Sequence, residues 1–252
     1  MQKKIISTNN LVKSFNSGSN KQTIINNLDL EIYANDFTII MGSSGAGKST
    51  LMYLLSGMDK ADSGTILFND KLINKMNNDE LAIFRRKNCG FVFQQIYLLD
   101  KMSLMDNVLA SGLLINSNKK EIIKKAKALF KKVNIPEITY KKNMNQVSGG
   151  ECQRAGIVRA AINNPTVIFA DEPTGALNSE NSNAVLDVLT DLNNDGQSII
   201  MVTHDKKSAL RGNRIIYLKD GKIFGELTLT KYDKYDQERT NKLDEFLKEM
   251  GW

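Results

Sequence analysis

The stretch "GSSGAGKST", residues 42–50, decides how the rest of this sequence is interpreted. It fits the phosphate-binding pattern G-x-x-x-x-G-K-[ST], in which a glycine-rich loop joins a strand to a helix. The run before it, "FTIIM" at 37–41, is apolar almost throughout, which is typical of a strand covered on both faces. The run after it, "LMYLLSG" at 51–57, predicts a short apolar helix. Because these flanks are what the motif requires, the sequence predicts nucleotide binding.

The residues of this loop suit a grip on a phosphate chain. Glycine tolerates backbone angles that other residues avoid, so Gly42, Gly45 and Gly47 let the chain turn tightly and aim its N–H groups inward. Lys48 adds a mobile positive charge for the outer phosphates, and the Ser49 hydroxyl is a ligand for Mg²⁺. We expect contacts from the whole loop, which comprises Gly42, Ser43, Ser44, Gly45, Ala46, Gly47, Lys48, Ser49 and Thr50.

Two carboxylates follow a second apolar run, "TVIFADEP" at 166–173. Ligands bind at the carboxyl ends of parallel strands, so this run is expected to deliver Asp171 to the same sheet edge as the glycine-rich loop. There Asp171 can reach Mg²⁺, directly or through its waters, and Glu172 is placed to act as base for an attacking water. The alternative is an ordinary solvated strand end.

His204 is the only histidine of the chain, and it follows a third buried-looking run, "SIIMVTHD" at 198–205. At the end of a strand in the same sheet, its imidazole can donate a hydrogen bond to developing phosphoryl charge or hold the attacking water. The alternative, a surface or core histidine without a chemical task, is the usual one for a lone histidine.

A second anion site is indicated by "VSGGECQR" at 147–154, which precedes the helical run "CQRAGIVRAAI". Ser148 is a good N-cap, and the N–H groups and dipole of a helix start attract anions. If both helix starts serve one nucleotide, the simplest arrangement is a head-to-tail pair of subunits. The spacing alone does not prove that arrangement.

The remaining segments indicate an α/β chain. Residues 1–41 are expected to form strands, with "LDLEI" at 28–32 alternating apolar and polar residues, and 166–205 reads as strand, helix and strand of a parallel sheet. The region of about 95–160 is predicted as a helical insertion with its own small core, including an amphipathic helix at 119–132. A hairpin around Asp220-Gly221 and a last helix at 242–250 complete the chain.

Composition excludes several classes of protein. With 252 residues, 41% hydrophobic and 25% charged, the chain is an ordinary globular protein without an apolar run of about 18 residues or a secretory signal at its start. Cys89 and Cys152 are too few for a disulfide framework or metal cluster, so we expect free thiols in a reducing cytoplasm. The net charge of +6 is compatible with nucleic acid, an anionic membrane surface or a solvated lysine-rich face. The helix at 119–132 lacks the interleaved aromatic residues that stack bases.

From about residue 5 to 227 the motifs and their order resemble an ATP-binding-cassette (ABC) ATPase. "GSSGAGKS" resembles the Walker A loop, "VIFADE" the Walker B strand, and "SGGE" the ABC signature, which is more specific than the first loop. The resemblance implies an α/β P-loop NTPase core with a mostly parallel sheet, an N-terminal antiparallel β subdomain and an α-helical signature subdomain. It implies one ABC ATPase domain over 1–227 and a C-terminal helical extension over 228–252.

The resemblance also implies roles for individual residues. ATP and Mg²⁺ are the expected cofactors, with Ser49, Gln94 and Asp171 on the metal. Glu172 is the implied catalytic base, Gln94 of "FVFQQ" the Q-loop residue and His204 the switch histidine. Phe15 stands where the family places an aromatic ring against adenine, with a core phenylalanine as the alternative. The implied contacts from a second subunit are Ser148, Gly149, Gly150 and Glu151.

Two longer stretches narrow the resemblance. "ADEPTGALN" and "GFVFQQIYLLDKMSLMDNV" look like the branch that serves macrolide exporters, lipoprotein-release systems and antimicrobial-peptide resistance transporters, with the overall length and tail closest to the peptide-resistance group. Three positions depart from the usual pattern. Asn178 replaces the D-loop aspartate, which puts in question the usual coupling between the two ATP sites of a dimer. Glu151 and Cys152 replace two glutamines.

These inferences predict the cytoplasmic ATPase subunit of a membrane transporter, a homodimer that works a separate integral membrane permease at the cytoplasmic face of the membrane. The loop of Gln94 and residues 95–112 are expected to dock the permease. No nucleic acid is expected as a partner. The alternatives are a soluble ABC ATPase acting on nucleic acid or ribosomes, and a non-hydrolysing ATP sensor. The helix before Trp252 either packs on its own domain or touches a partner.

Overall fold

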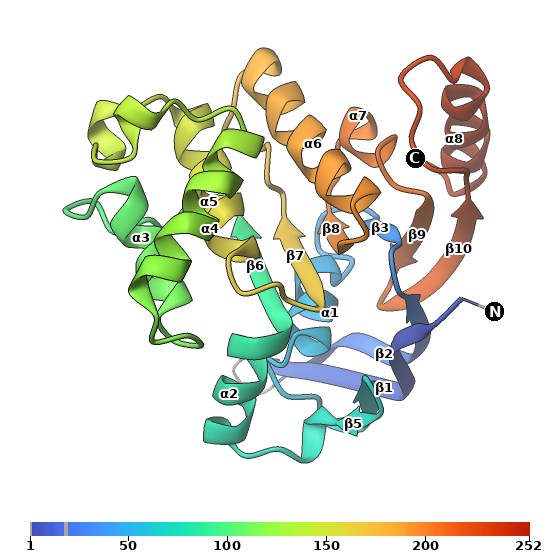
Figure 1. Cartoon of the computed structure of the whole chain (residues 1–252). Coiled ribbons are helices and arrows are strands. Elements are labelled where there is room, and N and C mark those ends of the chain that lie inside the picture. The colour runs from blue at the N-terminus through green and yellow to red at the C-terminus, as the bar shows by residue number, and fades with distance from the viewer. Residues whose placement is uncertain (1, 18–19) are drawn as a thin grey trace. The chain divides into compact units, whose positions relative to one another are not determined.

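The computed structural model describes residues 2–17 and 20–252 (Figure 1). The chain forms two compact units. Unit 1 comprises the described residues up to Ala82 together with Gly196–Trp252, and unit 2 comprises Ile83–Asp195. Helix α2 (Asn78–Asn88) contains the boundary between them. The α/β class predicted from the sequence is confirmed, with an antiparallel N-terminal sheet and a mixed sheet accompanied by helices.

Unit 1 begins with a purely antiparallel sheet in the order β2-β1-β4-β5. Its strands are β1 (Lys4–Ser17), β2 (Asn20–Tyr33), β4 (Ser63–Phe68) and β5 (Lys71–Leu72). The predicted alternation at 28–32 is present, because Leu28, Leu30 and Ile32 are buried while the two residues between them are exposed. One face of β2 therefore belongs to the core. The short helix η1 (Ile73–Lys75) follows β5.

The second sheet portion of unit 1 carries the glycine-rich loop. Strand β3 (Phe37–Met41) is fully buried and lies parallel to both β8 (Ser198–Val202) and β9 (Arg214–Lys219). Strand β10 (Lys222–Thr228) pairs antiparallel with β9 through the predicted hairpin, in which Asp220 and Gly221 have φ of 49° and 71°. The helices of this portion are α1 (Lys48–Leu55), α7 (Lys206–Ala209) and α8 (Gln237–Glu249).

Unit 2 combines two parallel strands with a group of helices. Its strands are β6 (Cys89–Phe93) and β7 (Val167–Asp171). Its helices are α3 (Leu104–Gly112), α4 (Lys119–Lys132), η2 (Glu137–Thr139), η3 (Met144–Gln146), α5 (Gly149–Ala161) and α6 (Ser179–Asn194). The apolar face of α4 is buried, and the ring of Phe130 stacks on that of Tyr140 with centroids 4.6 Å apart. The helical region thus has the small core that its periodicity predicts.

Some elements were not predicted from the sequence. Strands β4, β5 and β6 and helix α2 lie in segments to which no element was assigned. Gly90 shows why β6 needs an uncharacteristic residue, because a Cβ there would lie 2.4 Å from the carbonyl oxygen of Ala160 on α5. Cys89 and Cys152 are free thiols, as expected. Among the described residues, no helix is both long and apolar enough to cross a bilayer.

Candidate nucleotide-binding site

The loop between β3 and α1 adopts a conformation that its glycines allow. Gly42, Gly45 and Gly47 have φ of 145°, 79° and 97°, the region that other residues avoid. A Cβ on Gly42 would lie 2.2 Å from the carbonyl oxygen of Leu218, and one on Gly47 would lie 3.0 Å from that of Ile24. Both backbone strain and packing therefore demand glycine at these two positions.

The start of α1 is open to an anion. Gly47 is its N-cap, so no side chain caps the helix, and its first turn contains no acidic residue. Helix starts of this kind attract negative charge through their N–H groups and dipole. The ammonium group of Lys48 donates to the carbonyl oxygens of Gly42 at 2.9 Å and Ser43 at 2.8 Å, so the charge lies across the loop. Ser49 and Thr50, half-buried in the first turn, add hydroxyl groups.

Two further predicted residues of unit 1 are on its surface. His204 lies two residues beyond β8 and is exposed, which excludes a core position and agrees both with a site role and with the surface alternative. Phe15 on β1 is 47% exposed, which also differs from the core alternative. The ammonium group of Lys13 lies 5.0 Å from the centroid of the Phe15 ring and is held by Asp59 at 2.8 Å. Phe15 is therefore an accessible aromatic ring with a cation beside it.

In unit 2 the predicted residues gather where β6 and β7 end. These strands are parallel with Phe93 opposite Asp171, so Gln94 and Glu172 both follow the paired ends. A Cβ added to Gly175 would lie 2.8 Å from Nε2 of Gln94, which places the amide of Gln94 against the turn after β7. The structure thus brings Gln94, Asp171 and the turn of Glu172 to one edge of unit 2.

The backbone at Glu172 is strained. Its φ is 46°, in the left-handed region that costs a non-glycine residue about 1–2 kcal/mol. The N–H of Gly175 donates to the carbonyl oxygen of Glu172 at 3.0 Å and closes the turn. Strained residues of this kind concentrate at functional sites.

The predicted second anion site lies at the start of α5 in unit 2. Ser148 is the N-cap, as predicted, and its hydroxyl accepts from the N–H of Glu151 at 3.2 Å. The carboxylate of Glu151 in turn accepts from the N–H of Ser148 at 2.9 Å, which completes a capping box. Gly149 is exposed, and Gly150 is buried against Asn181, since a Cβ there would lie 2.2 Å from Oδ1 of Asn181.

Two departures from the family pattern have structural tasks. Asn178 caps α6 by accepting from the N–H of Asn181 at 2.9 Å, a bond that an aspartate also makes. Cys152 is buried, and its thiol donates to the carbonyl oxygen of Met144 at 3.5 Å. Burial raises the pKa of Cys152, and the charge of Glu151 raises it further, so this thiol stays protonated at neutral pH.

A family profile described as "ABC transporter" matches residues 25–175, which is more than half of the chain. The match begins in β2, contains the glycine-rich loop and the start of α5, and ends after Glu172. This chain belongs to the ABC transporter family. The sequence-based prediction of an ABC ATPase is confirmed, and the chain is an ATPase of this family.

Two curated relatives of this ABC cassette are named as export proteins. It is 37% identical over 248 residues to the bacitracin export ATP-binding protein BceA of Halalkalibacterium halodurans, covering 98% of this chain and 96% of that protein. It is 39% identical over 230 residues to the macrolide export ATP-binding/permease protein MacB of Pasteurella multocida, covering 91% of this chain and 35% of that protein. The ABC cassette thus spans about a third of the MacB relative and nearly all of the BceA relative.

A solved structure shares the fold of this ABC cassette. The ATP-binding cassette MJ0796, determined as a dimer in a post-hydrolysis state bound to ADP and Pi, is 35% identical with a TM-score of 0.83. The match covers 90% of this chain and 100% of that one. A further dimeric structure of the same protein gives a TM-score of 0.82.

Two residues that sequence reasoning missed bind the ABC motifs of unit 2 together. Gln153 on α5 is 1% exposed and donates to the carbonyl oxygens of Phe93 at 2.9 Å and Pro173 at 2.8 Å. Arg159, also on α5, donates to the carbonyl oxygens of Ile96 at 2.9 Å and of Tyr97. The only available signal was that Gln153 and Arg159, like Arg154, are polar residues in the largely apolar helix "CQRAGIVRAAI".

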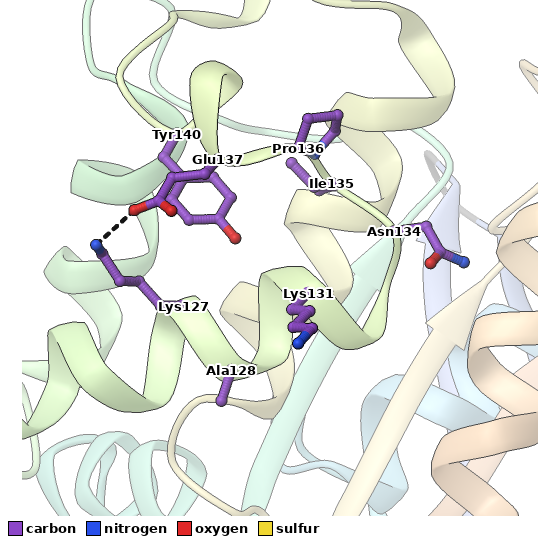
Figure 2. A pocket seen from close by; sticks show the side chains of 8 residues that line it. All are labelled: Lys127, Ala128, Lys131, Asn134, Ile135, Pro136, Glu137 and Tyr140. Carbon is purple, nitrogen blue, oxygen red and sulfur yellow. Dashed lines mark hydrogen bonds and ion pairs between the residues drawn. The ribbon is translucent and has the colours of Figure 1, made fainter.

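The pocket in Figure 2 lies elsewhere in unit 2 of this ABC cassette. It lies between the second half of α4 and the segment that includes η2, and none of the predicted site residues lines it. Lys127 and Glu137 form an ion pair of 2.6 Å across it, and Lys131 and Tyr140 also line it. It is therefore distinct from the residues that the ABC motifs identify.

Proposed function

We propose that this chain is the ATP-hydrolysing subunit of a transporter, working as a homodimer with a separate integral membrane permease at the cytoplasmic face of the cell membrane. The observation that carries the proposal is the pair of helix starts, one glycine-capped behind Lys48 and the other serine-capped at Ser148. Each suits one side of a bound triphosphate. The dimeric state of the structural relative MJ0796 supports the pairing.

In this proposal the glycine-rich loop of unit 1 holds the phosphates of ATP, and Phe15 stacks on adenine. The second subunit contributes the start of its α5 to the same triphosphate, through the Ser148 hydroxyl and the backbone of Gly149, Gly150 and Glu151. Ser49, Gln94 and Asp171 offer a hydroxyl, an amide oxygen and a carboxylate, the oxygen ligands that Mg²⁺ prefers. When bound there, Mg²⁺ neutralises charge on the phosphate oxygens.

Glu172 is the base that takes a proton from the attacking water. Its left-handed backbone (φ 46°) supports this role, since strained residues of this kind concentrate at functional sites. His204 donates a hydrogen bond to the phosphoryl group as charge develops on it. Its exposure beyond β8 supports this role, because a ligand can approach it there.

The permease docks on the segment after Gln94. Tyr97 and Leu99 are 63% and 57% exposed, large apolar side chains that normally mark a contact surface when they occur together. The guanidinium of the half-buried Arg159 holds the backbone of this segment. Docked there, a permease contacts residues adjacent to the metal ligand Gln94.

The transported substrate belongs to the antimicrobial peptides or lipophilic compounds. Support comes from the names of the relatives, bacitracin export for one that the chain matches over 96% of its length and macrolide export for another. The permease carries the substrate path, so these relatives indicate a class of substrate and no single compound.

The decisive experiment replaces Glu172 by Gln in the full chain. Phosphate release at saturating Mg-ATP should fall at least about 100-fold, while ATP-bound dimers accumulate in size-exclusion chromatography with light scattering. The exposed Glu180, at the start of α6, supplies the matched control, and Glu180→Gln should leave turnover and oligomeric state unchanged.

Unchanged phosphate release in Glu172→Gln would remove this residue as the base. A variant that stays monomeric at saturating ATP, even with membranes containing the permease, would remove the dimeric mechanism. Stimulation of turnover by nucleic acid and not by membranes would favour the soluble ATPase. Absence of turnover in the unsubstituted chain under both conditions would favour the ATP sensor.

A further inference from the structure

The residues after β8 form a short segment with little stability of its own. This His204 segment, residues 203–212, connects β8 to β9 and contains α7, which has only four residues. The carboxylate of Asp205 caps α7 by accepting from the N–H and the hydroxyl of Ser208, both at 2.7 Å. Because so short a helix is marginal by itself, its position depends on contacts from other elements.

Helix α8 supplies such contacts through a buried arginine. Arg239 is 2% exposed, and its guanidinium donates to the carbonyl oxygens of Leu210 at 2.6 Å and of Gly212, both in the His204 segment. A third bond goes to the carbonyl oxygen of Thr230 at 2.9 Å. Burial lowers the pKa of Arg239, and the charge of Asp236 opposes that effect. The buried charge of Arg239 therefore lies against the backbone at the end of α7, where helix carbonyls attract cations.

Two other contacts join the same elements. Lys206, the first residue of α7, forms an ion pair with Asp244 of α8. The ring of Tyr232, in the connection before α8, lies 4.4 Å from the guanidinium carbon of Arg211 and 5.6 Å from that of Arg239. The His204 segment is thus held at its start, at Arg211 and at its end.

Helix α8 is itself fixed without these polar contacts. Leu243, Phe246 and Leu247 on its inner face are buried. A Cβ added to Gly225 of β10 would lie 2.4 Å from the sulfur of Met250 and 3.1 Å from the ring of Phe246, so α8 packs closely on β10 (Figure 1). Loss of the Arg239 bonds should therefore free the His204 segment while α8 stays in place.

We infer that α8 positions the catalytic histidine, with Arg239 as the positioning residue that fixes the segment carrying His204. This inference rests on the proposed role of His204 in hydrolysis. It assigns the C-terminal helix a task in turnover that neither the motifs nor the resemblance indicates. A merely structural Arg239 would change stability and nucleotide binding together, whereas a positioning residue changes kcat and leaves ATP affinity intact.

The composition of the chain provides a direct readout, because His204 is the only histidine and Trp252 the only tryptophan. In untagged full-length protein, the imidazole signals in a proton–nitrogen NMR spectrum report on His204 alone. The fluorescence of Trp252, whose ring lies 6.5 Å from that of Tyr217 on β9, reports whether the end of the chain stays docked. One sample thus yields both the position of the segment and that of the helix.

The test compares Arg239→Met with Glu238→Gln. Arg239→Met should shift or broaden the His204 signals and lower kcat about tenfold, with KM for ATP within about twofold and Trp252 fluorescence unchanged. Glu238→Gln removes an ion pair of 3.0 Å with Lys242 on the exposed side of the same helix and should change none of these quantities. Unchanged His204 signals and kcat in Arg239→Met overturn the inference, as does a loss of ATP affinity equal to the loss of kcat.

If Arg239→Met does not fold, variants of the Lys206–Asp244 ion pair test the inference. Asp244→Asn should shift the His204 signals and lower kcat about twofold, and the exchange Lys206→Asp with Asp244→Lys should restore both. Unchanged signals in Asp244→Asn, or a loss that the exchange does not restore, overturn the inference.

Failure of the proposed function has a different outcome. If His204→Ala retains full turnover, the histidine has no role in hydrolysis. The His204 signals would still show whether Arg239 holds the segment.

Discussion

The two helix starts assigned to ATP differ in how their own N–H groups are used. At the start of α1, Gly47 provides no side-chain cap, and Lys48 folds back over the loop. At the start of α5, the hydroxyl of Ser148 accepts from the N–H of Glu151, and the carboxylate of Glu151 accepts from the N–H of Ser148. The first site is shaped for an anion before one arrives, and the second is closed on itself.

This difference assigns distinct tasks to the two starts. A side-chain cap contributes about 1 kcal/mol to a helix, so α5 is stable without a ligand, and α1 gains most when a phosphate takes the place of the missing cap. A phosphate that approaches α5 must compete with Glu151 for the Ser148 hydroxyl, which lies 3.0 Å from the carboxylate. In the proposed dimer, the triphosphate should therefore bind more readily to the start of α1 in one subunit than to the start of α5 in the other.

The largest expected effect is on ATP binding at the glycine-rich loop, where two alanine substitutions separate backbone strain from packing. Gly47→Ala should weaken ATP binding about 100-fold, equivalent to about 2.8 kcal/mol, because the added Cβ is strained and meets the carbonyl of Ile24. Gly45→Ala is the matched control, since φ there is also positive but nothing lies within 4 Å of its Cβ. About tenfold is expected for Gly45→Ala. Equal losses in equilibrium titrations with a fluorescent ATP analogue would contradict a packing requirement at Gly47.

A smaller effect is expected from a substitution at the start of α5, and it should appear only in the dimer. Ser148→Ala, made together with Glu172→Gln so that dimers persist, should raise the dissociation constant of the ATP-bound dimer about tenfold and leave ATP binding by the monomer unchanged. Asn118→Ala removes the N-cap of α4 in the same unit and should cost similar stability, about 1 kcal/mol, without changing dimerisation. Analytical ultracentrifugation measures the dimer, and equal dimer loss in both variants would make the Ser148 effect a matter of folding.

Replacing Glu151 by Gln should have a modest effect of opposite sign. The amide keeps an acceptor for the capping box but removes a negative charge beside the incoming triphosphate. We expect dimerisation about threefold tighter at low salt, since an exposed charge pair contributes about 0.5–1 kcal/mol, and a smaller gain at high salt. Weaker dimers would show instead that the carboxylate contributes to the contact.

The smallest expected effect is that of the Glu151 charge on the reactivity of the neighbouring Cys152 thiol. The charge of Glu151 is the second cause, after burial, of the raised pKa of Cys152. Glu151→Gln removes that cause, so the pKa falls, more thiolate is present at pH 8, and alkylation should be about twofold faster. Cys89, whose pKa is raised by burial, is the internal control and should keep its rate. Mass spectrometry of the two peptides measures both rates, and an unchanged Cys152 rate would contradict the proximity of the charge.

The features that the sequence predicts well are those with local causes. Gly47 is required by its own φ, and Ser148 caps a helix by a bond to the residue three positions later. Strand β3 is a continuous apolar run because both its faces are buried. Such signals lie within a few residues, so they can be interpreted without knowledge of the fold.

The features that the sequence does not predict have distant causes. Arg239 and Gln153 bond to carbonyl oxygens 9 to 29 and 20 to 60 positions away, respectively. Every residue has a carbonyl oxygen, so the partner leaves no mark in the sequence. Strand β6 was missed for a related reason, because Gly90 is explained only by the approach of Ala160.

The amide of Gln153 has two hydrogens, and it donates to the end of β6 at Phe93 and to the turn after β7 at Pro173. To move α5 alone would cost those two buried bonds, about 1–3 kcal/mol for each carbonyl left without a donor. Sliding α5 together with the ends of β6 and β7 costs neither. Arg159 of α5 also holds the carbonyl oxygen of Tyr97. A displacement of Tyr97 should therefore move α5 and, with it, the backbone beside Glu172.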